Sequence, residues 1–366
     1  MRHGLVLVTG AGGFVGSHVV EVLREAGYEV RATDRAGADS APSREAGASW
    51  VEADLLDPAE ARRVVQGVRG VIHAAGLYDL GLGWDALYNA NVMTSENVGK
   101  AAAEARVDKF VHIGSAGIYG LPDKGPSGER AAQEPPNDFE KTKQLSEEKI
   151  WRHQRFSGLR ATTLRPAMIY GPRGRYAVAT IMALFTLGAT RDYPWLRSIR
   201  GGALSHHVHV HDVARAAALL LRSSEAIGRS FNVADDTPVR WGELLQYVGD
   251  LSDFKGPSVP LHGPLSRIAS LVGTWMPSTK LIDLNKRLYD DWEALITKEG
   301  LDTPLLPRLD RDLLACLGQE RVCDTSAIRA LGFAPAHPVT LNGIRDTFDS
   351  YKAHGWLPGR RDLAQG

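Results

Sequence analysis

The sequence predicts an α/β protein: a doubly wound parallel sheet with a smaller, interleaved C-terminal domain. Two observations lead to this prediction. Through the first two-thirds of the chain, short apolar runs alternate with amphipathic stretches of helical spacing. After Pro166 this alternation breaks down, and the later segments resemble pieces of a second domain that is interleaved with the first. Strand–helix alternation is typical of a parallel sheet that is covered by helices on both faces.

The individual elements are expected in the order that such a sheet requires. Apolar runs predict strands at residues 5–9, 29–33, 49–53, 70–75, 109–115 and 161–171. Amphipathic stretches predict helices at 14–27, from the N-cap Asp57 and Pro58 onward, at 84–106, and through Lys143 to about Phe156. The later chain predicts a strand end and helix at 208–222, a strand, loop and helix at 230–251, a less regular stretch at 252–320, and short helices near the end.

These elements divide into two domains. We expect residues 1–170 to form the first domain, to which a segment near 203–232 returns. Residues 171–202 and 233–356 are expected to form the second domain, and 357–366 a frayed tail.

The composition is that of a globular protein and gives no sign of nucleic acid as a partner. Lysine plus arginine equals aspartate plus glutamate, at 43 each in 366 residues, so no excess positive charge favours a phosphate backbone. The two cysteines, Cys316 and Cys323, fit neither a disulfide framework nor a metal site. The longest apolar run, 177–189, is too short to span a membrane. We expect a cytoplasmic homodimer without a signal peptide, and we leave peripheral membrane contact open.

The stretch VTGAGGFVG, residues 8–16, is the strongest functional signal. Its glycines form a G-x-x-G-x-x-G pattern between an expected strand and an expected helix. Glycine permits a tight turn and a close approach of the backbone to a pyrophosphate, and the helix N-terminus offers N–H groups to the phosphates. The pattern predicts a dinucleotide site on a Rossmann-type sheet, formed by Gly10, Gly13, Phe14, Val15 and Gly16.

Acidic residues at the ends of the next two strands indicate which dinucleotide is bound. Asp34 ends the second expected strand, where a carboxylate accepts hydrogen bonds from the adenine-ribose hydroxyls and repels a 2′-phosphate. Arg35 would favour that phosphate, so we predict NAD, with NADP as the alternative. Asp54 and Leu55 follow the third strand and are expected near the adenine, although Asp54 could instead cap the next turn.

With these residues assembled, the chain resembles the extended short-chain dehydrogenase/reductase family over roughly residues 5–250. HAAG (73–76) is similar to the family's fourth-strand motif, and NANVMTSENVGKAA (89–102) resembles its Asn-Val helix. IGSAGIYG (113–120) resembles the fifth-strand motif, and LRPAMIYGPRG (164–174) the segment that passes the nicotinamide. The resemblance implies a structural hydrogen-bonding role for Asn91 and cofactor contacts from Ala74, Ala75, Gly76, Pro166 and Ile169.

The same resemblance implies a catalytic serine, tyrosine and lysine, but the chain lacks the tyrosine. The matching positions are Ser115, Phe139 and Lys143. In the family the tyrosine exchanges a proton with the substrate oxygen, the lysine binds the nicotinamide ribose and lowers the tyrosine's pKa, and the serine orients the substrate. Phe139 keeps the shape of the ring but cannot exchange a proton.

Three interpretations of Phe139 stay open. It is a deliberate substitution in an otherwise intact site, or it belongs to a natural enzyme with another donor, or to a dinucleotide-binding protein without turnover. Tyr78 and Tyr119 are expected within reach of the substrate, so they are candidates for a substitute proton donor. Tyr170 is a weaker candidate for the same role. The acids on either side of Phe139 are expected to point away from it, because neighbours on a helix diverge.

The stretch GGALSHHVHVHD, residues 201–212, bears on the substrate. Family members that act on nucleotide sugars often carry an arginine there, near the diphosphate, whereas this chain has Ser205, His206 and His207. This difference argues against a nucleotide sugar, and His207 is expected to contact the substrate. The histidines lack the further ligands of a metal site apart from Asp212, so we predict no metal ion. The apolar region 177–300 indicates a core or a wide apolar pocket.

Together these observations predict an NAD(P)-dependent oxidoreductase. We expect it to act on a secondary alcohol or ketone of a bulky apolar, sterol-like small molecule, because the chain is similar to the 3β-hydroxysteroid dehydrogenase branch of the family. A nucleotide-sugar epimerase or reductase is the first alternative. A non-catalytic dinucleotide-binding protein is the alternative from another class.

Overall fold

The computed structural model describes residues 3–79, 81–120, 125–191, 193, 196, 198–261 and 278–359. The chain divides into two compact units. Unit 1 consists of Met1–Ile169, Val208–Ala234 and Cys323–Ala336, and unit 2 of Tyr170–His207, Asp235–Val322 and His337–Gly366. The sequence predicts residues 323–336 in the second domain, but they belong to unit 1. The reason is that α13 (Ser326–Ala330) packs on β11 (Ser230–Val233) and adds Ile328 and Phe333 to the core of unit 1.

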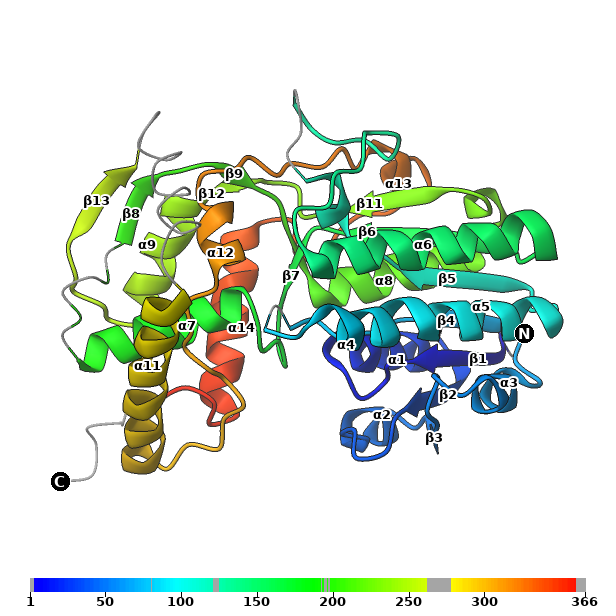
Figure 1. Cartoon of the computed structure of the whole chain (residues 1–366), viewed down its shortest axis with the longest axis horizontal. Coiled ribbons are helices and arrows are strands. Elements are labelled where there is room, and N and C mark those ends of the chain that lie inside the picture. Colours follow the sequence, from blue (N-terminus) through cyan, green and yellow to red (C-terminus); the bar gives the residue numbers. More distant parts are fainter. Residues whose placement is uncertain are drawn as a thin grey trace. The chain divides into compact units, whose positions relative to one another are not determined.

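A seven-stranded parallel sheet forms the centre of unit 1, as the sequence predicts (Figure 1). The strand order is β11-β6-β5-β4-β1-β2-β3. It reverses between β1 and β4, and such a switch point is where doubly wound sheets bind ligands. Besides β11, the strands are β1 (His3–Thr9), β2 (Tyr28–Asp34), β3 (Ser49–Glu52), β4 (Gly70–His73), β5 (Lys109–Ile113) and β6 (Ala161–Pro166).

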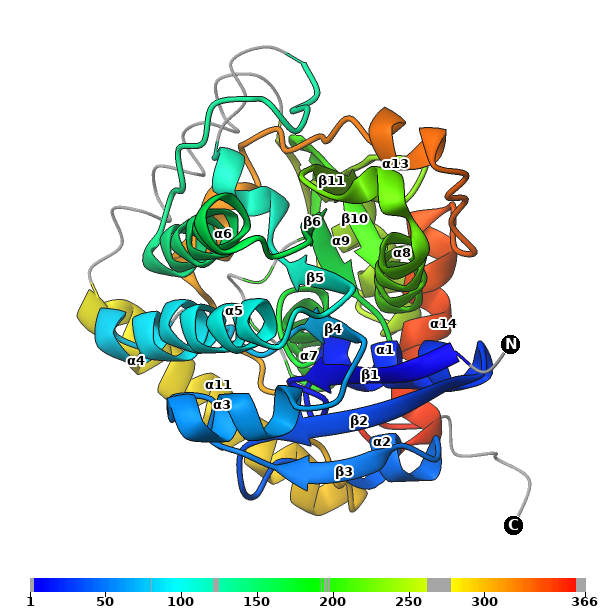
Figure 2. The same cartoon turned by 90° about the vertical axis from the view of Figure 1, so that its right-hand side faces the viewer.

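Helices cover both faces of this sheet (Figure 2). The pair α1 (Phe14–Glu25) and α8 (Val210–Arg222) covers one face. The other face carries α3 (Pro58–Val65), α5 (Thr94–Glu104) and α6 (Asp138–Ser157), and α2 (Ala41–Glu45) lies beside α1. Strand residues point alternately to the two sides. Val6 and Val8 of β1 therefore enter the core beneath α1 and α8, whereas Leu7 enters the core beneath α3, α5 and α6.

The helix expected over 84–106 is interrupted. It consists of α4 (Trp84–Tyr88), a π-helical segment (Asn89–Met93) and α5. The side chains supply a local reason, because the hydroxyls of Thr94 and Ser95 donate to the carbonyls of Ala90 and Asn91, at 2.6 and 2.7 Å. Hydroxyls that bond back in this way compete with the regular helical bonds. Single π-helical turns of this kind are frequent at functional sites.

Unit 2 is mainly helical, and the sequence underestimates its regularity. The stretch expected to be irregular contains α11 (Ser278–Glu299), a helix of 22 residues. Its buried residues Leu288, Trp292 and Leu295 recur at helical spacing, which fits one face packed against a core. The other α-helices in the described part of unit 2 are α7 (Val178–Thr190), α9 (Trp241–Leu251), α12 (Arg311–Cys316) and α14 (Thr340–Ala353).

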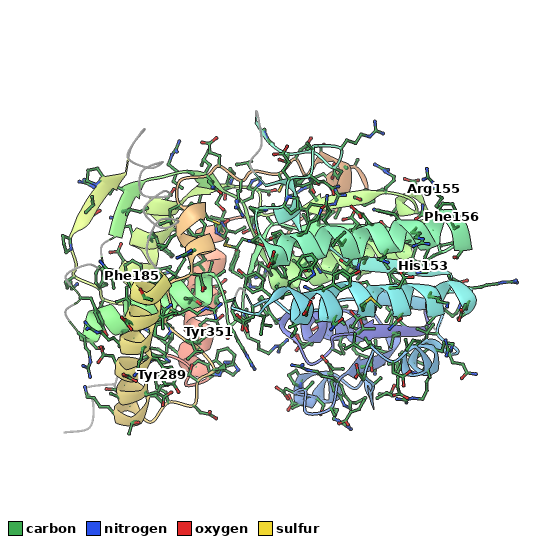
Figure 3. All side chains as sticks on the ribbon, in the orientation of Figure 1. His153, Arg155, Phe156, Phe185, Tyr289 and Tyr351 are labelled. Atoms are coloured by element: carbon green, nitrogen blue, oxygen red, sulfur yellow. The ribbon has the colours of Figure 1, made fainter. Side chains whose placement is uncertain are left out.

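Short strands and buried hydrogen bonds complete unit 2. The strands β8 (Ser198–Gly201) and β13 (Ser258–Leu261) pair in parallel, and β9 (Leu204–Ser205) pairs antiparallel with β12 (Val239–Arg240). Tyr351 lies on α14 (Figure 3). Its buried hydroxyl donates to the carbonyls of Gly171 and Gly174, at 3.0 and 2.7 Å. Among the residues that the structure describes, every helix is too short or too polar to cross a bilayer.

A buried ion pair attaches α6 to the sheet. Glu147 on α6 and Arg165 on β6 are each 3% exposed. The guanidinium donates twice to the carboxylate, with Nε–Oε2 and Nη2–Oε1 distances of 2.9 and 2.5 Å. Trp151 Nε1 and Ser230 Oγ also donate to Oε1, at 2.8 and 3.0 Å. The carboxylate is therefore fully hydrogen-bonded, which offsets the cost of removing two charges from water.

We expect Arg165→Met to lower the free energy of unfolding by about 3–5 kcal/mol, because it leaves Glu147 buried and unpaired. The matched control is Arg69→Met, which breaks the pair Arg69–Asp108, whose side chains are 72% and 59% exposed. That change should cost less than about 1 kcal/mol. Urea unfolding followed by circular dichroism measures both losses, and equal losses would contradict the role given to the buried pair.

Candidate active site

The glycine-rich turn lies at the switch point, between β1 and α1. Gly10 has a φ of +68°, and a Cβ added to it would lie 2.7 Å from the backbone N of Ala75. The turns that follow β1 and β4 are therefore in direct backbone contact. A Cβ on Gly16 would lie 2.1 Å from the carbonyl oxygen of Gly10, so α1 also starts tightly against the turn.

Gly13 occupies the open side of this turn. It is exposed, and an added Cβ would meet only Gly10 O, at 3.1 Å. Gly13 is also the N-cap of α1 and provides no capping side chain. The first N–H groups of a helix have no partner within the helix, so those of Phe14 and Val15 are available to an anion.

Asp34 lies where β2 ends, beside the glycine-rich turn. Its carboxylate accepts hydrogen bonds from the backbone N–H groups of Gly12, at 3.0 Å, and Arg35, at 2.8 Å. These bonds hold the carboxylate in one orientation and leave further lone pairs on both oxygens. The Arg35 residue is exposed.

Asp54 and Leu55 follow the third strand. Asp54 accepts from Leu56 N at 3.0 Å, which is a turn-capping bond, and Leu55 is buried in the core. Contacts of Asp54 and Leu55 with an adenine stay predictions.

A chain of buried hydrogen bonds connects β1, β4 and the π-helical segment. Ala75 N donates to Thr9 Oγ1 at 3.2 Å, and Thr9 Oγ1 lies 2.8 Å from His73 Nδ1. His73 Nε2 lies 2.9 Å from Ser95 Oγ, which donates its own hydrogen to Asn91 O. Since the serine hydrogen is already used, His73 donates from Nε2 and accepts at Nδ1. Burial lowers the pKa of His73 to about 3, so the ring stays neutral.

Asn91 holds the segment after β4 in place. Its Oδ1 accepts from Leu77 N at 2.7 Å, and its Nδ2 donates to Leu77 O at 3.2 Å and to Thr142 Oγ1 at 2.9 Å. Thr142 in turn donates to Phe139 O at 2.7 Å. A Cβ on Gly76 would lie 2.7 Å from Asn91 Oδ1, so only glycine fits there. We call this arrangement of Asn91, Leu77 and Thr142 the Asn91 clamp.

Lys143 lies one helical turn after Phe139 on α6. Its ammonium donates to Ile113 O at 2.6 Å, at the end of β5. Burial lowers the pKa of Lys143 to about 8, and the charges of Glu140 and Glu147 act in the opposite direction. From the sequence, the side chain of Glu140 is expected to point away from Phe139. In the structure its carboxylate is buried against Gly117, next to the turn after β5.

Ser115 follows β5 and begins a short 3-10 helix, Ala116–Tyr119. Its Oγ accepts from Gly117 N at 3.0 Å. This bond uses a lone pair, so the hydroxyl hydrogen is not consumed by it. The half-buried serine can therefore donate to a substrate oxygen.

Phe139 and Tyr78 are in direct contact. Their rings meet edge to face, with centroids 4.7 Å apart and an interplanar angle of 86°. Both residues are half-buried. The contact brings the segment after β4 against the first turn of α6, where Asn137 caps the helix by accepting from Glu140 N at 2.9 Å.

The structure argues against Tyr119 as a proton donor to the substrate. Tyr119 is 4% exposed, and its hydroxyl donates to Asn232 Oδ1 and accepts from Arg165 Nη1, both at 2.7 Å. Burial raises the pKa of Tyr119 to about 12. Its phenol is a structural link in the buried network around Arg165, which a residue pattern alone does not reveal.

The two other candidates belong to unit 2. Tyr170 is buried and donates to Asp235 Oδ2 at 2.9 Å. His207 is fully buried against the rings of Tyr170 and Trp241, with centroid distances of 6.4 and 5.5 Å. Burial lowers the pKa of His207 to about 3, so it is neutral. His207 and His209 lie on β10 (His207–His209), whereas His211 lies on α8, which begins at Val210.

The remaining predicted cofactor residues lie along the carboxyl ends of β4 and β6. Ala74 and Ala75 are half-buried and Gly76 is exposed. Pro166 is the last residue of β6, and Ile169 belongs to the next short strand, β7 (Met168–Tyr170). The expected strand 161–171 is thus divided in two.

A glycine-rich turn at the switch point, an acid at the end of β2, and a serine and a lysine beside α6 define a dinucleotide-binding oxidoreductase domain. The chain belongs to the NAD dependent epimerase/dehydratase family, whose sequence model matches residues 6–234. This family is the extended short-chain dehydrogenase/reductase group that the motifs resemble. Because the family is NAD-dependent, its match confirms the cofactor class predicted from the glycine motif.

Individual relatives differ in the reaction that their names state. The chain is 25% identical, over 94% of its length, to 3beta-hydroxysteroid-dehydrogenase/decarboxylase isoform 2 of Arabidopsis thaliana, and spans 61% of that protein. It is 30% identical to cinnamoyl-CoA reductase 1 of Oryza sativa subsp. japonica, covering 68% of this chain and 75% of the rice protein.

A solved structure shows the same fold. A dTDP-glucose 4,6-dehydratase from Streptomyces venezuelae, with NAD and TYD bound, matches with a TM-score of 0.72. The match covers 96% of this chain and 98% of the dehydratase at 21% identity, which establishes the shared fold.

We expect the affinity for NADH to fall between about pH 7 and pH 9, and to lose this dependence in Lys143→Met. The ammonium has a pKa of about 8, so it is charged at the lower pH and largely neutral at the higher one. Titration of nicotinamide fluorescence measures the affinity. Lys141→Met is the control, because Lys141 lies exposed on the same helix. An unchanged pH profile in Lys143→Met would contradict contact between this ammonium and the cofactor.

Proposed function

We propose that the protein is an NAD-dependent oxidoreductase that interconverts a secondary alcohol and a ketone on a bulky apolar, sterol-like molecule. The observation that carries the proposal is the surviving framework around Phe139. The chain keeps Ser115, Lys143 and the Asn91 clamp, and each makes the hydrogen bonds described above. Only the phenol at residue 139 is missing.

The residues at the switch point fit the cofactor. The open Gly13 face and the start of α1 can hold the pyrophosphate, and the oriented carboxylate of Asp34 can accept from the ribose hydroxyls. When bound, NAD supplies the acceptor or donor of a hydride at its nicotinamide. Lys143 would hold the nicotinamide ribose at the end of β5, and Ser115 would orient the substrate oxygen with its hydroxyl hydrogen.

The apolar substrate class is supported by two observations. The likeness to the Arabidopsis hydroxysteroid dehydrogenase/decarboxylase extends over 94% of this chain, well beyond the cofactor motifs. In addition, the segment in which nucleotide-sugar enzymes often place an arginine offers no guanidinium here. His206 and His207 are 8% and 0% exposed, and burial keeps His207 neutral.

Two alternatives keep some support. The dTDP-glucose 4,6-dehydratase shares the fold, so a nucleotide-sugar reaction is the second candidate. A dinucleotide-binding protein without turnover is less well supported, because Ser115 keeps a hydroxyl that such a protein does not need. A homodimer and a cytoplasmic location stay predictions.

We expect Asp34→Ala to weaken NADH binding by about 10- to 100-fold, because it removes hydrogen bonds to a charged acceptor. The affinity for NADPH should fall much less, since its 2′-phosphate is no longer repelled. Fluorescence titration with both dinucleotides gives the ratio. Asp108→Ala is the control, because Asp108 lies before β5 and bonds Arg69. Equal losses for NADH and NADPH would contradict selection by Asp34.

We expect the protein to oxidise 3β-hydroxysterols in the presence of NAD, and Ser115→Ala to lower kcat by about 10²–10³-fold through loss of a preorganised donor. The assay follows NADH formation with the sterol and NADH consumption with an aromatic aldehyde. Chromatography of the sugar product tests UDP-glucose, because epimerisation leaves NAD unchanged overall. The affinity for NADH should stay unchanged in the variant. Turnover of UDP-glucose alone would favour the nucleotide-sugar alternative.

A further inference from the structure

We infer that Tyr78 is the proton donor and acceptor of the reaction, in place of the phenol that residue 139 lacks. The inference deepens the proposed function and rests on it. It names a catalytic residue that lies on the loop after β4 and not on α6.

The first argument is the direct contact between the two rings. Tyr78 meets Phe139 edge to face, with the centroids 4.7 Å apart. The ring of Tyr78 therefore lies beside the ring that carries the phenol in the family. Tyr78 is also half-buried, so it combines contact with the site and access to solvent.

The second argument is that this contact is held by hydrogen bonds. Leu77, the residue before Tyr78, is bonded at both its N–H and its C=O by the side-chain amide of Asn91. The same amide donates to Thr142, which donates to Phe139 O. The backbone before Tyr78 is therefore tied to the helical turn that carries Phe139. A catalytic group needs such support if it is to stay within about 0.5 Å of its working position.

The third argument concerns the other tyrosines that the structure describes in unit 1. Tyr28 is the first residue of β2 and therefore lies at the amino ends of the strands, whereas the glycine-rich turn lies at their carboxyl ends. Tyr88 packs on Trp84, with a centroid distance of 5.7 Å. Tyr119 is buried and bonded to Arg165 and Asn232. Among these described tyrosines, Tyr78 is the one whose ring contacts residue 139.

The chemistry is balanced without a further reactant. In the direction of reduction, the carbonyl carbon gains a hydride from the reduced nicotinamide, and the carbonyl oxygen takes the phenolic proton of Tyr78. The resulting phenolate regains a proton from water. In the direction of oxidation the phenolate would remove the hydroxyl proton of the alcohol, and the carbinol carbon would give its hydride to the oxidised nicotinamide. Lys143 lies on the same face of α6 as Phe139, one turn further on.

The test compares four proteins: the native chain, Tyr78→Phe, Phe139→Tyr and the double variant. We expect Tyr78→Phe to lower kcat by about 10²–10⁴-fold, the usual effect of losing a positioned acid or base. Phe139→Tyr alone should change kcat by less than about tenfold, because a donor is already present. Circular dichroism and thermal melting check that all four proteins fold alike.

The double variant separates catalysis from packing. It has a phenol at residue 139 and none at residue 78, so we expect kcat to return to within about tenfold of the native value. A tyrosine that only packs would be replaced by phenylalanine with little loss, and adding a phenol elsewhere would restore nothing. Rescue therefore identifies the proton as the property that Tyr78 supplies.

A second measurement does not depend on turnover. Tetranitromethane nitrates accessible tyrosines, and mass spectrometry locates the modified residues. We expect Tyr78 to be nitrated in the free protein and protected when NAD is bound. Tyr289 on α11 is 49% exposed and serves as the control, which should be nitrated equally in both states. Nitration of Tyr78 that NAD does not change would overturn its placement beside the nicotinamide.

The remaining outcomes distinguish the inference from the proposed function. An active native protein, a fully active Tyr78→Phe variant and a large gain in Phe139→Tyr would overturn the role of Tyr78 and leave the proposed function standing. Absence of turnover in all four proteins, with NADH still bound, would overturn the proposed function and the donor role together.

Discussion

The bidentate pair of Glu147 and Arg165 is the interaction on which the arrangement of unit 1 depends. It lies between α6 and β6, with both residues 3% exposed, and connects them to Tyr119 and Ser230. A charge buried at this depth must meet its partner, because leaving it unpaired is far costlier than losing an ordinary contact. This requirement restricts α6 to one rotation and one height above the sheet. The position of every side chain that α6 directs toward the site is therefore fixed as well.

The Asn91 clamp fixes the position of the start of α6 in a similar way. One side-chain amide bonds the loop after β4 and the first turns of the helix, and the π-helical segment carries it. The chain of bonds through His73 and Thr9 extends this support to the glycine-rich turn. The dinucleotide turn and the region around Phe139 are therefore parts of one polar network. Phe139 is joined to that network through its backbone carbonyl, which accepts from Thr142.

The sequence predicts features that depend on local pattern and misses those that depend on contacts between distant residues. The sheet and its main helices follow from the period of apolar residues, and the cofactor turn from glycine spacing. The sequence predicts that Glu140 points away from Phe139, because helix neighbours diverge, but its burial depends on the separate turn at Gly117. Tyr119 was a candidate donor by position, and only the fold shows that Arg165 and Asn232 bind it. The helix α11 lies in the stretch expected to be irregular, although its buried residues Leu288, Trp292 and Leu295 follow helical spacing.

The discontinuity of the two units has a consequence for biosynthesis. The first segment of unit 1 ends at Ile169. The last segment of unit 1 is Cys323–Ala336, which brings Ile328 and Phe333 to its core. About 150 residues separate these two points of the chain, and translation at roughly 5–20 residues per second needs about 8–30 s to cross them. Within that interval α8 and β11 are translated first and complete the sheet. The part of the core that receives Ile328 and Phe333 stays uncovered on the nascent chain until most of unit 2 has been translated.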